Sequence, residues 1–394
     1  MMRTLADIAG QNGRCAETIY IGVGTRIQRE QAEVIQPMEE TIKIGLDVVP
    51  MSYPPSGVRA YVQALIDAFR SRDSGIDLVP LAPLSGLTRS TNRLSRLSWD
   101  VHGITGSAET ARVDLLHMTR FAAPRAIGRP FVVTVHDLIP LQLPEYRASL
   151  PSRVQSELAR RSVGSANRII VPSRFVGGEV TSLLGVPAER IDVIPMGVSI
   201  PPEPAHPPFL AGPYILHAGG FDVRKNLPAL IRAFGLAAPE LGSDWRLVLL
   251  GAPHTGNAVV YPPLSPVIER AGLQDRVILT GRVSESEKHT LYQHAAIAVA
   301  PSISEGFGLP ILEAMAHGIP VIASNCTSHP EVAGEAALLV EPTDAKLAAG
   351  LIRLAADADL RTDLATRGRA RAAEFPWSHT ATLTVATYRA VLNS

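Results

Sequence analysis

Short runs of β-branched and other apolar residues alternate with amphipathic stretches from residue 41 onward. This alternation is typical of β-α units, which build a parallel sheet with helices on both of its faces. Six strand candidates lie in the first half of the chain, at 42–49, 77–81, 113–117, 131–135, 168–171 and 191–194. Six more lie at 214–217, 246–250, 276–280, 297–300, 320–323 and 337–340. The pattern predicts an α/β protein with two doubly wound, Rossmann-like parallel-sheet domains that face each other across a cleft.

The stretch 201–213 separates the two series of strands and contains six prolines. Because proline has no N–H to donate and a fixed φ, this stretch reads as a stiff linker. We expect an N-terminal domain over 41–200 and a C-terminal domain over 214–376. The stretch 375–378 (FPWS) breaks the chain, and a last helix from about Thr380 to Leu392 is expected to return, so that 377–394 packs on the first domain. Residues 1–40 read as an irregular extension.

Length, charge and cysteine content narrow the class of protein. A chain of 394 residues is too long for one ordinary core and suits two. The 37 basic residues balance the 37 acidic ones, so no net field attracts nucleic acid. Cys15 and Cys326 have no metal-ligand spacing, which favours a reducing compartment such as the cytoplasm. The apolar runs are shorter than the ~20 residues of a membrane-spanning helix, so we expect no transmembrane segment and at most peripheral contact with the inner membrane face.

The segment 304–318 (SEGFGLPILEAMAHG) follows a buried strand and turns through Gly306 and Gly308 into a helix. Pro310 suits the first helical position and Gly318 suits the end, and the amino terminus of such a helix favours an anion. Glu305 and Glu313 have seven residues between them. Their carboxylates can accept hydrogen bonds from a sugar and a ribose. The alternative is that both are solvated charges or partners of the helix dipole.

The segment 217–226 (HAGGFDVRKN) is a second strand end with a glycine pair, Gly219 and Gly220, before a helix predicted at 227–236. Arg224 and Lys225 at this turn could neutralise a diphosphate leaving group without a metal. The alternative is a solvated basic turn.

The stretch 134–140 (TVHDLIP) places His136 and Asp137 at the carboxyl edge of the first sheet, where ligands gather in such folds. The alternative is a structural histidine followed by an aspartate that caps a helix. A further candidate anion loop, Ser56 to Arg59, contains Gly57.

Three other patterns are set aside. Gly22-Val23-Gly24 lacks the remaining elements of a dinucleotide fingerprint, and no phosphate loop of the G-x-x-x-x-G-K-[ST] type occurs. Asp357 and Asp359 resemble a metal-binding pair, but they lie between helical patterns, where aspartate serves as an N-cap.

With these segments in place, residues 41–394 resemble glycosyltransferase family 4 of the GT-B fold. The resemblance rests on the E-x₇-E element from Glu305 to Glu313, the GG-x₄-KN-like stretch from Gly219 to Asn226, and VHDLIP at 135–140. The stretches 194–198 (IPMGV), 280–281 (TG) and 375–389 are similar to further parts of the family pattern. The chain departs from that pattern at Gly220, where many members have arginine, at Met196, where asparagine is usual, and in the loop SGVRAY.

The resemblance implies a retaining hexosyltransferase with a nucleotide-diphosphate sugar donor, GDP-mannose before others, and a glycan or lipid-linked saccharide acceptor. It implies no metal and no other cofactor. Arg224 and Lys225 would bind the diphosphate and Glu313 the ribose, while Glu305 and His136 would face the transferred sugar. The implied catalytic residues are His136, Arg224, Lys225 and Glu305, and the implied donor site also includes Gly57, Gly219, Gly220, Gly306, Phe307, Gly308, Leu309 and Glu313.

Several alternatives stay open at this point. The donor could be of the UDP-glucose type or GDP-rhamnose. A nucleotide-sugar 2-epimerase would keep the phosphate site and lack a macromolecular acceptor, and a non-catalytic binding subunit would have no need of the cations and the glutamate pair. The acceptor is not determined by the sequence, because variable loops such as 50–57 and 84–110 would line its pocket.

Overall fold

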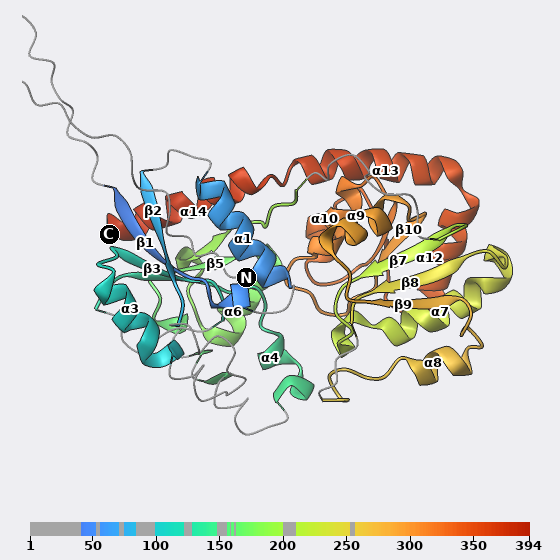
Figure 1. Ribbon diagram of the computed structural model, residues 1–394, viewed down its shortest axis with the longest axis horizontal. Coiled ribbons are helices and arrows are strands. Elements are labelled where there is room, and N and C mark those ends of the chain that lie inside the picture. The colour runs from blue at the N-terminus through green and yellow to red at the C-terminus, as the bar shows by residue number, and fades with distance from the viewer. Residues whose placement is uncertain are drawn as a thin grey trace, which may run out of the picture. The chain divides into compact units, whose positions relative to one another are not determined.

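A computed structural model describes residues 41–52, 56–70, 75–83, 99–121, 128–147, 156–157, 159–160, 163–199, 210–252 and 257–394. Within it, Thr41–Ser394 form one compact unit (Figure 1). The predicted extension 1–40, most of the predicted linker, at 201–209, and the loop residues 84–98 lie outside the described residues.

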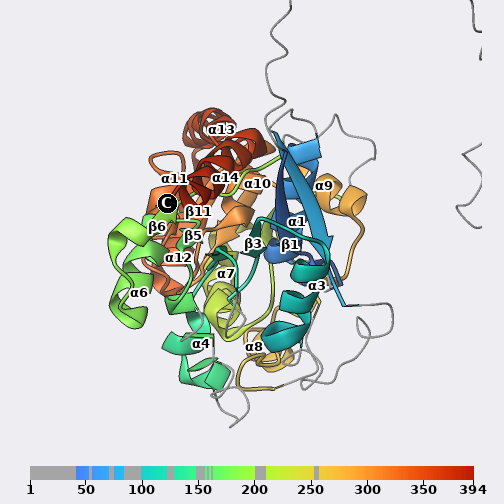
Figure 2. The same ribbon diagram turned by 90° about the vertical axis from the view of Figure 1, so that its left-hand side faces the viewer.

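The first sheet contains six strands, all parallel, in the order β2-β1-β3-β4-β5-β6 (Figures 1 and 2). The strands are β1 (Ile42–Asp47), β2 (Ile76–Leu81), β3 (Leu115–Met118), β4 (Phe131–Thr134), β5 (Arg168–Val171) and β6 (Ile191–Val193). The helices between them are α1 (Gly57–Arg70), α3 (Ile104–Thr110), α4 (Ile139–Gln142) and α6 (Arg174–Leu184), with short turns η1 (Val49–Ser52), η2 (Trp99–Gly103), η3 (Pro144–Arg147) and η4 (Ala188–Arg190). The central strands β3 and β4 are buried at every position, which explains why their residues, apart from His117 and Thr134, are apolar.

The second sheet is also parallel and has the order β12-β11-β10-β7-β8-β9. Its strands are β7 (Tyr214–Ala218), β8 (Arg246–Leu250), β9 (Val277–Gly281), β10 (Ile297–Ala300), β11 (Val321–Ser324) and β12 (Leu338–Val340). The chain moves outward from β7 to β9, then returns to the centre at β10. The carboxyl ends of β7 and β10 therefore meet at a point where the strand order reverses, which is where open α/β sheets bind ligands.

The helices of the second half follow the same alternation, with several ends displaced from the predicted ones. They are α7 (Leu227–Leu241), α8 (Ser265–Arg270), α9 (Glu285–Gln293), α10 (Leu309–Ala316), α11 (His329–Ala333), α12 (Asp344–Ala356), α13 (Ala358–Ala373) and α14 (Trp377–Leu392), and η5 (Val223–Lys225) precedes α7. Helix α7 continues past the predicted end at 236 because its buried face extends to Leu241. Between α12 and α13, the side chain of Asp357 accepts a hydrogen bond from the Leu360 N–H at 2.8 Å, which confirms its predicted capping role.

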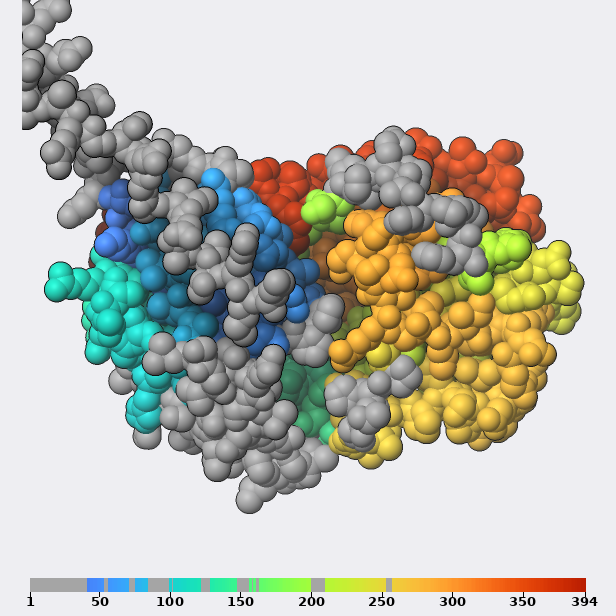
Figure 3. All heavy atoms as spheres, in the orientation of Figure 1, coloured from blue at the N-terminus to red at the C-terminus, as the bar shows by residue number. Residues whose placement is uncertain are grey.

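Helix α14 lies against α1 and β5 of the first sheet (Figure 1), and in Figure 3 the red atoms of the C-terminal helices extend along one edge of the face shown. It begins at Trp377, earlier than the predicted Thr380, directly after Pro376. The Tyr388 hydroxyl is 2.6 Å from Nδ1 of the buried His117, and the Thr387 hydroxyl donates to Asp192 at 2.9 Å. Among the helices of the described residues, none is both long enough and apolar enough to cross a membrane.

Candidate functional site

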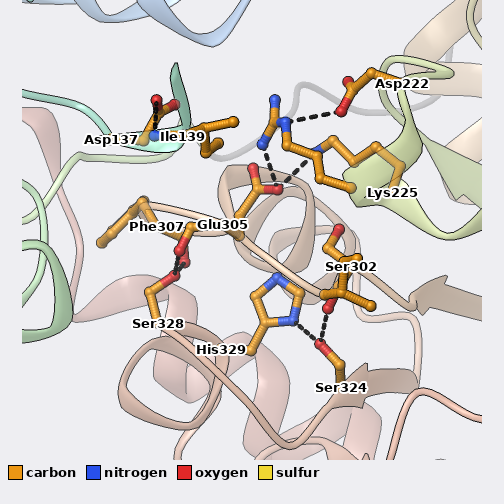
Figure 4. A network of polar contacts seen from close by, with 12 residues as sticks. Asp137, Ile139, Asp222, Lys225, Ser302, Glu305, Phe307, Ser324, Ser328 and His329 are labelled. Carbon is orange, nitrogen blue, oxygen red and sulfur yellow. Dashed lines mark hydrogen bonds and ion pairs between the residues drawn. The ribbon is translucent and has the colours of Figure 1, made fainter. Parts of the chain in front are cut away.

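An ion-pair cluster lies where β7 and β10 end (Figure 4). The Lys225 Nζ donates to Glu305 Oε2 at 2.8 Å, and Arg224 Nη1 donates to the same oxygen at 2.9 Å. Lys225 is 5% exposed, so its ammonium is held well inside the protein. The structure thus brings together the two cations of one predicted motif and the first glutamate of the other.

The backbone between the two motifs is also fixed. The Ile303 N–H donates to the Arg224 carbonyl at 2.8 Å. Asn226, which adopts a left-handed conformation with φ of 55°, donates from its side chain to the Pro342 carbonyl at 2.8 Å. These bonds hold the turn before α7 against the loop that follows β10, so the geometry of the cluster does not depend on the ion pairs alone.

Asp222 and Tyr146 complete the cluster on its other side. Arg224 Nε is 2.9 Å from Asp222 Oδ1, and the Tyr146 hydroxyl donates to the same oxygen at 2.8 Å. Tyr146 lies in η3, among the elements of the first sheet. Its pKa is raised by burial and by the neighbouring Asp222 carboxylate, so the hydroxyl keeps its proton and acts as a donor. Arg224 is therefore fixed by carboxylates at two of its nitrogens.

The charges of the cluster are close to balanced. Burial alone would raise the pKa of Glu305, but Lys225 and Arg224 outweigh it and hold the pKa below its usual range. Burial raises the pKa of the nearby Asp137, against the opposing effect of Arg224. A buried carboxylate that stays ionised only because two cations contact it marks a place where those cations could instead contact another anion.

The loop from Glu305 to Gly308 is anchored through its carbonyl groups. The Ser328 hydroxyl lies 2.9 Å from the Glu305 carbonyl and 2.8 Å from the Phe307 carbonyl, and the Ser173 hydroxyl donates to the Gly306 carbonyl at 2.7 Å. Gly308 has a φ of 108°, which favours glycine at the turn into α10.

Gly306 lies directly against the end of β4. A Cβ atom at this position would lie 1.8 Å from the His136 carbonyl oxygen, so only glycine permits the approach. The His136 Nε2 donates to the Thr119 carbonyl at 3.1 Å, and the ring lies edge-on to Tyr61 with a centroid distance of 4.9 Å. Burial lowers the pKa of His136 to about 4, so its ring is neutral at pH 7. Asp137 accepts from the Ile139 N–H at 3.3 Å, as expected of an aspartate before a helix.

Glu313 lies apart from the ion-pair cluster, one helical turn inside α10. Its Oε2 accepts from the Tyr292 hydroxyl at 2.9 Å, and its Oε1 accepts from Lys288 Nζ at 3.2 Å. Tyr292 is buried and its ring stacks on His317 at a centroid distance of 4.9 Å. The two donors fix the Glu313 carboxylate, whose side chain remains 24% exposed.

Of the remaining predicted site residues, four lie in the two motifs of the second sheet, and one, Gly57, lies in the first half of the chain. Gly219, with a φ of 155°, lies beside the cluster, since a Cβ there would be 3.7 Å from Lys225 Cε. Gly220 is exposed next to Asp222, Phe307 is buried edge-on to Phe375, and Leu309 begins α10. Gly57 begins α1 and is exposed, and a Cβ there would meet nothing within 4 Å, so the described residues do not connect it to the cluster.

Sequence reasoning missed several residues of this region, namely Tyr146, Asp222, His217, Ser328 and His329. Asp222 lies inside the motif 217–226 and could have been found there, since an aspartate two residues before an arginine is a natural partner. His217 has an Nε2 atom that is buried and without a hydrogen-bond partner among the described residues. Among those residues, no group of three or more His, Cys, Asp or Glu side chains is placed to hold a metal ion.

Comparison with known proteins identifies the family. The family described as glycosyl transferases group 1 matches residues 204–371, and the one described as Glycosyltransferase Family 4 matches residues 55–200. The chain is 32% identical to O-antigen chain mannosyltransferase B of Escherichia coli over 286 residues, which cover 70% of this chain and 74% of that relative. It is 30% identical to serotype-specific mannosyltransferase WbdA of Escherichia coli over 58% of this chain, but spans only 27% of that longer relative.

A solved structure shows the same fold at lower identity. Sucrose-phosphate synthase from Thermosynechococcus elongatus superposes with a TM-score of 0.70 and 21% identity, over 89% of this chain and 99% of that chain. The arrangement of two parallel six-stranded sheets is the GT-B fold. The chain belongs to glycosyltransferase family 4 and is a glycosyltransferase.

Proposed function

We propose that this glycosyltransferase moves a mannosyl group from GDP-mannose to a glycan or lipid-linked saccharide, with retention of the anomeric configuration. The observation that carries the proposal is the cluster of Lys225, Arg224 and Glu305 at the reversal point of the second sheet. The mannosyl donor is supported by relatives named as mannosyltransferases.

In this proposal the two cations leave Glu305 for the donor. Lys225 and Arg224 stabilise the negative charge that grows on the diphosphate as it departs, which is the role of preorganised cations in phosphate chemistry. Glu305, released from them, accepts hydrogen bonds from hydroxyls of the transferred sugar. The departing phosphate helps to deprotonate the acceptor on the same face, so no protein nucleophile is required.

The other residues take supporting roles. Glu313, held by Tyr292 and Lys288, accepts the two hydroxyls of the ribose. The His136 carbonyl contacts Gly306, which follows Glu305 in the chain, and we propose that the His136 side chain faces the transferred sugar from the first sheet. We also propose that the reaction needs no metal, since the two cations supply the positive charge.

Donor screening tests the proposal. A ligand that binds only the folded protein raises its melting temperature with the logarithm of ligand concentration. GDP-mannose should raise it more than GDP-rhamnose or UDP-glucose, and transfer from GDP-mannose should continue in excess EDTA. Proton NMR of the product should show the α-anomer retained. A larger shift with UDP-glucose would overturn the donor assignment, an inverted product would overturn retention, and release of a free epimerised sugar nucleotide would identify an epimerase.

A further inference from the structure

His329 begins α11, five residues after the last residue of β11, Ser324, and it is buried with 1% exposure. Its Nδ1 is 2.7 Å from the Ser324 hydroxyl oxygen, and that hydroxyl lies 2.6 Å from the Ser302 carbonyl. Because a carbonyl can only accept, the one serine proton goes to Ser302. The Ser324 oxygen must then accept from His329, so the ring proton is on Nδ1 and Nε2 carries the lone pair.

The Nε2 side of the ring faces the loop that carries Glu305. A Cβ atom at Gly308 would lie 3.1 Å from Cδ2 and 3.5 Å from Nε2 of His329. In Figure 4 the ring lies between Ser324 and Glu305. Among the described residues, Nε2 has no hydrogen-bond partner. A ring nitrogen without a hydrogen-bond partner, next to an ion-pair cluster, is an unused position for a proton.

The ring is neutral while Glu305 is paired. Burial lowers the pKa of His329 to about 4; the Glu305 carboxylate opposes this effect and the Lys225 ammonium adds to it. These two groups, one from the loop after β10 and one from η5, are the charged groups that act on the ring, since Ser324 of β11 carries no charge. Any event that moves Lys225 away from Glu305 therefore favours protonation of His329.

We propose that His329 is a positioning residue that takes up a proton when the donor diphosphate draws Lys225 and Arg224 away from Glu305. This inference rests on the proposed function. The diphosphate adds negative charge beside the cluster, and both cations turn toward it. Without a replacement, Glu305 would be a buried carboxylate with no cation, which is costly. The imidazolium of His329 supplies the replacement positive charge, so Glu305 stays ionised and oriented toward the sugar.

Isothermal titration calorimetry with GDP-mannose tests the proposal. GDP-mannose has no terminal phosphate that titrates near neutrality, so protons that appear or disappear on binding come from the protein. Titrations at pH 7 in two buffers with different ionisation enthalpies give the number of protons taken up. We expect on the order of one proton per GDP-mannose for the wild type, and an affinity that falls as the pH rises above neutrality.

Variants separate this role from a structural one. His329→Asn keeps an amide near the Nδ1 position for Ser324 but has no titrating nitrogen, and should bind GDP-mannose without proton uptake. His294→Asn, a change at an exposed histidine, should behave as the wild type. If His329→Asn does not fold, His329→Leu provides the same comparison with an apolar side chain.

Each outcome bears on a separate claim. Binding of GDP-mannose to the wild type without proton uptake overturns the inference and leaves the proposed function intact. Proton uptake that persists in the folded His329 variant also overturns the inference, and would mean that another group, such as His217, takes up the proton. If neither GDP-mannose nor UDP-glucose binds the wild type, the proposed function fails together with the inference.

Discussion

Replacement of Gly306 by alanine should separate the two sheets at the site. The new Cβ would lie 1.8 Å from the His136 carbonyl oxygen, whereas ordinary contacts begin at 3.4 Å. The loop that contains Gly306 and the chain at the end of β4 must therefore move apart by about 1.6 Å. The atom in the way is backbone, which cannot rotate aside. Overpacking of this kind costs about 1–3 kcal/mol of folding free energy, and a misplacement of ~1 Å in an active site can lower turnover ~10²-fold.

The matched control is Gly178→Ala on α6. Gly178 is exposed, and a Cβ there would meet nothing within 4 Å. This variant should gain up to about 1 kcal/mol of stability from helix propensity, with unchanged turnover. Urea unfolding and the rate of GDP release from GDP-mannose are measured on both variants. If Gly306→Ala has the stability and rate of the wild type, the close approach of Gly306 to His136 is not the functional geometry.

Three further predictions follow from buried polar groups. Burial lowers the pKa of His117 to about 3 and those of His136, His217 and His329 to about 4. Since the unfolded chain binds more protons, the free energy of unfolding should fall as the pH drops from about 6.5 to about 4, by up to about 3 kcal/mol per histidine. A free energy of unfolding, measured with urea, that stays constant between pH 7 and 5 would contradict this. His136→Ala should lower the single-turnover rate far more than the nucleotide affinity. If His136 is purely structural, its removal should lower only the melting temperature. Tyr292→Phe removes a donor to Glu313 and should weaken GDP binding about tenfold. Tyr214→Phe, which loses a hydrogen bond to the Leu291 carbonyl, should affect stability alone. Equal GDP affinity in the two variants would show that Tyr292 is not part of the donor site.

The fold was largely predictable from the sequence, because parallel strands buried on both faces leave continuous apolar runs. Strands β5, β8 and β10 occupy the predicted residues, and the others differ by a few residues at their ends. Helix ends were less predictable. The sequence shows Pro239 near the end of α7, but the tertiary contacts of Leu241 keep the chain helical beyond it.

The site was only partly predictable. Arg224, Lys225 and Glu305 stood in motifs with glycines, and their meeting follows from the adjacency of β7 and β10. The bond from Tyr146 to Asp222 and the bond from Ser173 to the Gly306 carbonyl join elements of different sheets, which no local pattern encodes. His329 gave no signal, because a single histidine near a strand end is more often structural than functional. Its environment becomes apparent only from Ser324 and Glu305 around it.

The affinity of the protein for GDP after removal of one buried lysine tests the central claim most directly. Lys225→Ala takes away a cation that contacts Glu305 at 2.8 Å, whereas Lys346→Ala removes an exposed lysine of α12. We predict that Lys225→Ala, folded by circular dichroism, binds GDP at least about tenfold more weakly and turns over on the order of 10²-fold more slowly, while Lys346→Ala matches the wild type. A folded Lys225→Ala variant with wild-type GDP affinity and turnover would show that the diphosphate binds elsewhere.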